Sequence, residues 1–97
     1  MRIVHCMRDH YTHYIGRPHK EIPRQEWEGS VFGNPFPLYK ESERAVVIRR
    51  FEDYARSTPS ILDAIAALPE DAVLGCWCAP KPCHGAIIVT IWKELHS

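Results

Sequence analysis

The sequence predicts a small α/β domain with a mostly parallel central sheet flanked by helices. Residues 72–78 form an almost wholly apolar run, which is typical of a central strand covered on both faces. Two helical patterns separate this run from a strand-like segment at the start of the chain, so we expect the two strands to pair in parallel. A length of 97 residues fits one domain over residues 1–97.

The N-terminal part of the chain contains two segments rich in β-branched and aromatic residues. Arg2–Cys6 and Tyr11–Arg17 are therefore predicted strands, with Asp9 and His10 in the turn of a hairpin between them. Four prolines and two glycines follow within residues 18–38. They predict a long irregular segment, and such segments in compact domains are often functional.

Three helices and one further strand complete the predicted order β-β-loop-α-α-β-α. The apolar spacing predicts a helix over Ser42–Arg56, with its first residue as the N-cap. A second helix over Ser60–Leu68 follows a Thr-Pro pair suited to a helix start. After the apolar strand, a short proline-rich connection leads to a final helix that begins at Cys83 or His84 and ends near Leu95.

The charge balance excludes some classes of partner. Lys plus Arg and Asp plus Glu both number 12, so the sequence carries no strong nucleic-acid signal and no attraction to an anionic membrane. No segment approaches the length of a membrane span, and the N-terminus is too polar for a signal peptide, so we expect a cytoplasmic protein. A chain this short buries a thin core, for which a homodimer contact is one source of added stability.

The segment Gly75–Gly85, with sequence GCWCAPKPCHG, is the candidate site. It follows a predicted parallel strand, and α/β sheets bind ligands at the carboxyl ends of such strands. It also leads into a helix N-terminus, whose free backbone N–H groups favour an anion and would lower the pKa of Cys83. We therefore expect Cys83 as a nucleophile, His84 as a general acid or base, and Cys78 and Gly85 in the ligand site.

A zinc site is the alternative use of the same residues. Cys78, Cys83 and His84 would be three ligands around an open position, with Cys76 as a fourth. In a flat strand the Cβ atoms of Cys76 and Cys78 lie roughly 6.6 Å apart, whereas zinc needs its sulfurs within about 4 Å. A shared metal therefore requires the chain to bend at Cys78, and Cys76 is explained more simply as a buried thiol.

The N-terminal half of the chain supplies the other candidate ligand-binding residues. Arg17 could grip a phosphate or carboxylate with two hydrogen bonds, or form an ordinary surface ion pair. The remaining candidates are Tyr14, Gly16, Asn34 and Phe36, of which the last is expected more as a loop anchor than as a stacking surface.

Other charged and aromatic residues are expected to be structural or solvated. His10, His13 and His19 are scattered along the predicted hairpin, where histidines usually face solvent. The arginines of the 42–56 helix, Arg44 included, are mixed with acidic residues, which is typical of a solvated helix face.

The motifs YIGRP, GNPF and LGCWCAPKPCHG, with a helix before the last, resemble the DUF4326 family of small bacterial and phage proteins. The resemblance covers nearly the whole chain. Two features depart from the family pattern: a long insertion between Arg17 and Asn34, and Ala86 where the family often carries an acidic residue. The Cys-His sequence before a helix is also similar to that of the DUF488 family. Neither resemblance implies a reaction.

Three functions are consistent with these observations. The first is a pocket for a small anionic, nucleotide-like ligand, with or without thiol-based catalysis. The second is a zinc-binding structural or interaction module. The third is a phage protein that sequesters a nucleotide without changing it.

Overall fold

A three-stranded, fully parallel sheet forms the centre of the computed structural model, which describes residues 1–97. The strands are β1 (Arg2–His5), β2 (His13–Tyr14) and β3 (Val73–Cys76), and β3 lies between the other two. The predicted parallel pairing of the first strand with the 72–78 region is confirmed. The predicted hairpin is wrong, because β1 and β2 each hydrogen-bond to β3 and not to each other.

Residues 6–12 connect β1 to β2 and cross one face of β3, so this face is covered by a loop. The ring of Tyr11 lies against Gly75, where a Cβ atom would sit 2.7 Å from the ring. Tyr11 also donates a hydrogen bond to the Glu26 carboxylate. A glycine in the central strand therefore makes room for the crossing.

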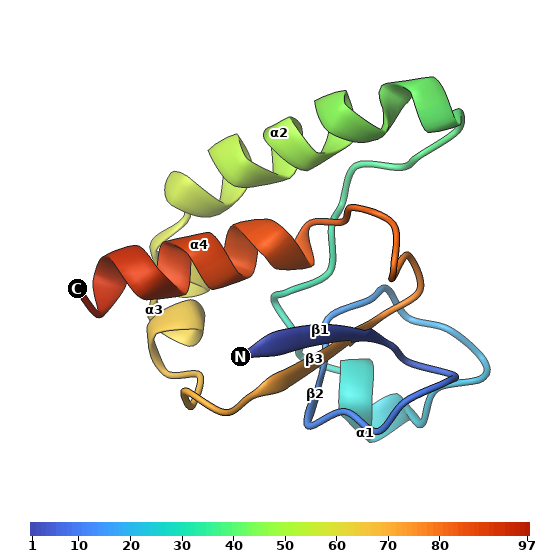
Figure 1. Cartoon of the computed structure of the whole chain (residues 1–97), viewed down its shortest axis with the longest axis horizontal. Helices are drawn as coiled ribbons and strands as arrows, with labels where there is room; N and C mark the ends of the chain where they lie inside the picture. Colours follow the sequence, from blue (N-terminus) through green and yellow to red (C-terminus); the bar gives the residue numbers. More distant parts are fainter.

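Three of the four α-helices lie on the other side of the sheet (Figure 1). These are α2 (Arg44–Arg56), α3 (Pro59–Ala66) and α4 (Gly85–Leu95). Contacts join α4 to β1 and to both other helices. The fourth, α1 (Arg24–Trp27), is a single turn within the predicted irregular segment and contacts β2.

The helix boundaries differ slightly from the predicted ones. Thr58 is the N-cap of α3, with a proline in the first turn, as its Thr-Pro pair predicted. Ser42 is not the N-cap of α2, because a 3₁₀ turn over Glu41–Glu43 precedes that helix and Glu43 occupies the cap position. The candidate cysteine segment thus joins the end of β3 to the start of α4 directly.

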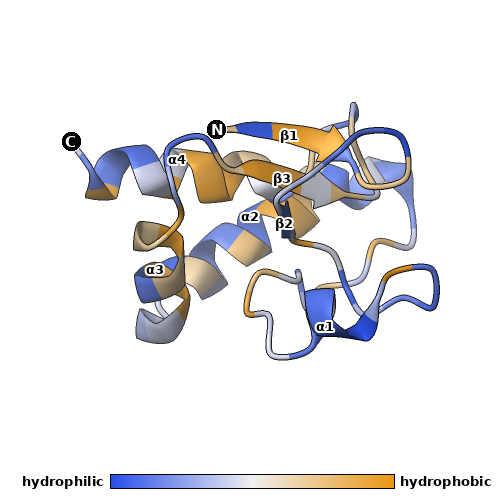
Figure 2. Ribbon diagram, turned by 90° about the horizontal axis from the view of Figure 1, so that it is seen from below, coloured by the Kyte–Doolittle hydropathy of each residue, from blue (hydrophilic) through white to orange (hydrophobic).

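The main core lies between the sheet and the helices, where apolar residues of β3 and α4 face each other (Figure 2). Alternation along β3 directs Leu74 and Cys76 into this core, whereas Trp77 packs with the smaller cluster on the opposite face. The largest fully buried side chains are Ile15, Phe51, Ile61, Ile65, Leu74, Ile88 and Ile91. None of the helices has the length and apolar character needed to span a lipid bilayer.

Candidate functional site

A cleft of about 380 Å³ lies where β2 and β3 end and α4 begins. Its walls come from four segments: residues 16–19 after β2, residues 34–38 of the long loop, the first turns of α2, and the cysteine segment. The predicted residues Gly16, Arg17, Asn34, Phe36, Cys76, Cys78, Cys83 and His84 all line it. The structure thus assembles most of the predicted site from segments far apart in the chain.

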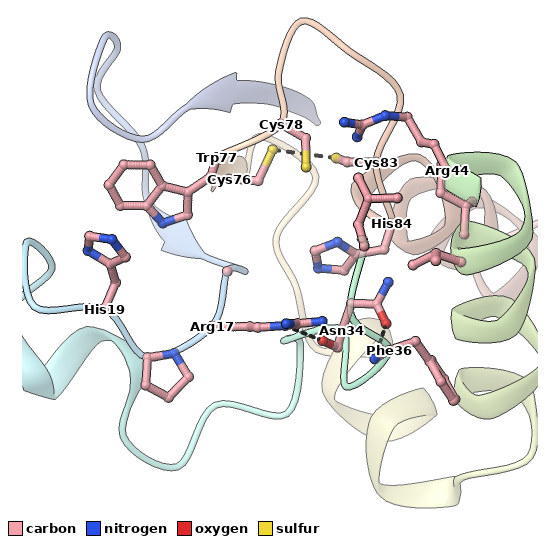
Figure 3. Close-up of a pocket in the computed structure, with 15 residues that line it drawn as sticks. Arg17, His19, Asn34, Phe36, Arg44, Cys76, Trp77, Cys78, Cys83 and His84 are labelled. Carbon is pink, nitrogen blue, oxygen red and sulfur yellow. Dashed lines mark hydrogen bonds between the residues drawn. The ribbon is translucent and has the colours of Figure 1, made fainter. Parts of the chain in front are cut away.

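Cys76 and Cys83 form a buried thiol pair, with their sulfur atoms 3.4 Å apart (Figure 3). Either sulfur can be the donor of the hydrogen bond between them, and this bond, with backbone N–H groups of residues 78 and 79, lowers the pKa of Cys76. The same hydrogen bond and burial raise the pKa of Cys83. The expected low pKa of Cys83 is therefore wrong, and Cys76 is the more acidic thiol of the two.

The N-terminus of α4 does not offer the free backbone N–H groups that the sequence led us to expect. The Gly85 N–H donates to the Cys83 sulfur, and those of Ala86 and Ile87 donate to the carbonyl oxygens of Cys83 and His84. Gly85 itself lies outside the cleft lining, where its Cα packs against isoleucine side chains of the core. Its predicted place in the ligand site is corrected on this ground.

His84 lies at the base of the cleft, 8% exposed, with its Nε2 atom 2.9 Å from the carbonyl oxygen of Ile15. A carbonyl oxygen only accepts, so Nε2 carries the proton of the neutral ring and Nδ1 keeps a lone pair. Burial lowers the pKa of His84, and the positive charge of Arg17 lowers it further. His84 is therefore neutral at neutral pH and carries no charge with which to bind an anion.

Arg17 presents most of its guanidinium to the cleft. Its Nε atom donates to the carbonyl oxygen of Asn34, while its two Nη groups have no partner in the protein. The Asn34 side-chain oxygen accepts from the Phe36 N–H, so the amide nitrogen of Asn34 also remains available. Both residues are held by the backbone around them and direct hydrogen-bond donors into the cleft.

Arg44 is a second cleft arginine, and its predicted place on a solvated helix face is wrong. It forms two hydrogen bonds to the Glu41 carboxylate and one to the carbonyl oxygen of Pro82. These bonds connect the start of α2 to the cysteine segment. Glu41 and the neighbouring Cys78 raise the pKa of Arg44, which stays charged. Figure 3 shows Arg17 and Arg44 on different walls, with His84 between them in this view.

Trp77 forms an aromatic wall whose orientation depends on Tyr14. The indole N–H donates to the Tyr14 hydroxyl at 2.7 Å, and this hydroxyl donates to the carbonyl oxygen of Arg17 at 2.6 Å. A Cβ atom at Gly16 would overlap the same hydroxyl. Tyr14 lies outside the cleft lining, so its predicted role as a ligand contact is corrected: it holds Trp77 and the Arg17 backbone in place.

His19 packs against Trp77 in the cleft wall, with ring centroids 4.3 Å apart and the ring planes tilted by 37°. It was expected to be solvated, and it does remain exposed. Phe36 also lines the cleft, and its ring packs edge-on against Tyr54 of α2. Figure 3 shows this ring directed away from the cysteines, as the expected loop anchor would be.

The residues of the predicted zinc site do not fit a metal in this arrangement. No three His, Cys, Asp or Glu side chains are grouped so that they could hold an ion. The Nε2 atom of His84 points at a carbonyl oxygen, and the sulfurs of Cys76 and Cys83 are hydrogen-bonded to each other. All four cysteines are free thiols.

Sequence reasoning missed Arg44, His19 and Trp77 as lining residues, along with Pro18, Leu38, Val47 and Ile48. Alternation along a strand places Trp77 on the face opposite Cys76 and Cys78, so it gave no sign that all three line one cleft. No local signal distinguishes Arg44 from the other arginines of α2. Its role depends on where the cysteine segment lies.

Comparison with known families places the chain in the family described as a domain of unknown function, DUF4326, whose model matches residues 4–94. The chain belongs to this family. Comparisons with curated proteins and with solved structures find no match.

Proposed function

We propose that this DUF4326 domain binds a small anionic, nucleotide-like molecule in the cleft between Arg17, Arg44 and Trp77. The observation that carries the proposal is the charge of the lining. Two arginines line the cleft, and no aspartate or glutamate does. The Nη groups of Arg17 have no protein partner, so the strongest donors of the cleft are free for a ligand.

The anionic part of the ligand is expected at Arg17. A guanidinium matches the oxygens of a phosphate or carboxylate with two parallel hydrogen bonds. The Asn34 amide nitrogen lies beside it and can donate to the same group or to a sugar hydroxyl. Arg44 already satisfies a carboxylate and a carbonyl, so we assign it a supporting electrostatic role.

The nucleotide-like character rests on the aromatic wall and on size. The indole of Trp77 is held rigidly by Tyr14, and an immobilised aromatic ring is a favourable surface for a planar base. A volume of about 380 Å³ lies within the range of small-ligand pockets. The free thiols of all four cysteines suit a cytoplasmic protein, where nucleotides are abundant.

Binding without chemistry is the simpler form of this proposal. The predicted nucleophile Cys83 is buried and its pKa is raised, which disfavours direct attack on a ligand. A sequestering protein would release its nucleotide unchanged after incubation. Analysis of the recovered ligand by chromatography distinguishes this from catalysis by the cleft thiols or His84.

Calorimetric titration with nucleoside mono- and diphosphates tests the proposal. For a ligand that binds the wild type, Arg17→Gln should weaken affinity about 10- to 100-fold, since a hydrogen bond to a charged group contributes roughly 1.5–3 kcal/mol. Arg50→Gln is the matched control, because Arg50 is an exposed arginine of α2 outside the cleft. Equal affinity of the two variants, or no binding of any such compound by the wild type, would refute it.

A further inference from the structure

Beyond ligand binding, we propose that Cys76 and Cys83 are a redox pair that exchanges electrons with a low-molecular-weight disulfide entering the cleft. The two sulfurs lie 3.4 Å apart, so they need to approach by about 1.4 Å to reach the length of a disulfide bond. The pair connects the last residue of β3 to Cys83, two positions before the start of α4. Two thiols are thus held close in a folded segment before any oxidation.

Access to the pair is through the cleft. Both cysteines are more than nine-tenths buried, yet both contribute to the cleft lining, beside the half-buried Cys78. A disulfide small enough to enter the cleft can therefore reach a sulfur atom without unfolding the domain. Cys6 does not line this cleft, because it belongs to the smaller cluster on the opposite face of the sheet.

Cys76 is the attacking thiol of the pair. Its hydrogen bond with Cys83 and the backbone N–H groups of residues 78 and 79 stabilise a thiolate at position 76. Cys83 is the resolving thiol, since it lies within reach of the Cys76 sulfur and receives a hydrogen bond from the Gly85 N–H as it ionises. The arrangement assigns different roles to the two cysteines, which the experiment can separate.

The exchange balances in atoms and electrons. The Cys76 thiolate attacks one sulfur of the disulfide R–S–S–R, forming a mixed disulfide and releasing one RS⁻. Cys83 then loses its proton and attacks the Cys76 sulfur, which releases the second RS⁻. The two protons given up by the cysteines convert both leaving groups to RSH. The protein is oxidised by two electrons, and the small disulfide is reduced to two thiols.

The test incubates the folded protein with glutathione disulfide in glutathione buffers of increasing oxidation, followed by acid quenching and peptide mass mapping. We expect the loss of two of the four thiols and one bond, between Cys76 and Cys83. A bond that includes Cys6 or Cys78, or four thiols that survive the most oxidising buffer, would overturn the proposal. This measurement on the wild type depends on no variant that could fail to fold.

Variants separate the two roles. Cys83→Ser should accumulate a glutathione adduct on Cys76, because the resolving thiol is absent, whereas Cys76→Ser should form at least tenfold less adduct at Cys83. Cys6→Ser and Cys78→Ser should form the 76–83 bond like the wild type. Adducts at Cys83 instead of Cys76, or loss of the bond in Cys78→Ser, would contradict the assigned route. Arg50→Gln, at an exposed position outside the cleft, should also oxidise normally.

Discussion

His84 connects the cleft to the core at the scale of single residues. Its ring packs edge-on against Phe51, with centroids 4.8 Å apart, and its Nε2 atom bonds to the carbonyl oxygen of Ile15. The buried, neutral ring is a structural element as well as a cleft surface. Charging it would place a positive charge in the core, close to the positive Arg17.

The lowered pKa of His84 predicts that stability falls as the pH drops through the ordinary histidine range. The unfolded chain gains a proton near the ordinary histidine pKa of about 6.5, whereas the folded chain resists it. The contribution of neutral His84 to the free energy of unfolding is therefore fully present above this pH and decreases below it. Urea unfolding at pH values between about 5.5 and 7.5 should show a midpoint that falls with pH.

Two histidine variants check the origin of that slope. His84→Asn should flatten it, while His10→Asn, at an exposed position outside the cleft, should leave it unchanged. Arginine partners lower the pKa values of Glu41 and Glu94, so these carboxylates respond at lower pH, below about 5. An unaltered slope in His84→Asn would assign the effect to another group.

At the scale of secondary-structure elements, the position of β3 decides the site. Because β3 is the central strand, its carboxyl end lies between the segment after β2 and the start of α4. The central position requires the chain to cross from β1 to β2 over one face of β3. Gly75 permits that crossing, since the Tyr11 ring occupies the space of a side chain.

Gly75→Ala should therefore destabilise the domain by about 1–3 kcal/mol, the usual cost of overpacking. Urea unfolding of a double-mutant cycle with Tyr11→Ala measures the coupling. The cost of Gly75→Ala should be smaller in the Tyr11→Ala background, where the ring is absent. The same cost in both backgrounds would show that the crossing loop does not constrain residue 75.

At the scale of the whole molecule, one apolar core supports both the helices and the cleft. Phe51 of α2 is fully buried and contacts both the core and the His84 ring. In a chain of 97 residues the total free energy of unfolding is of the order of 5–15 kcal/mol. The free-energy cost of a single large cavity in this core is therefore a substantial fraction of the total free energy of unfolding.

Phe51→Ala should lower the free energy of unfolding by about 3–5 kcal/mol, as measured by chemical denaturation. Val46→Ala is the matched control on the same helix, because Val46 is 51% exposed and should change stability by less than about 0.5 kcal/mol. A loss below about 1 kcal/mol for Phe51→Ala would place this ring outside the cooperative core.

The sequence by itself determined the local elements and the place of the site. Apolar periodicity identified α2, α3 and α4 within a few residues of their observed ends, and the apolar run identified β3 as central. The hydrogen bonds and side-chain spacing within one helix or strand depend on residues that are close in the chain. The local sequence is therefore sufficient to predict these elements. Because β3 and α4 were both predicted from the sequence, the position of the cysteine segment between them was predicted as well.

Only the tertiary structure decided the strand order and the composition of the cleft. Trp77 meets Tyr14 across 63 positions of sequence, and Arg44 meets Pro82 across 38. The Cys76–Cys83 contact likewise depends on the path of the intervening turn. Such contacts arise when packed elements bring distant residues together, and no local pattern encodes them. The cleft is therefore a property of how β2, β3, α2 and α4 pack around the segment that the sequence identified.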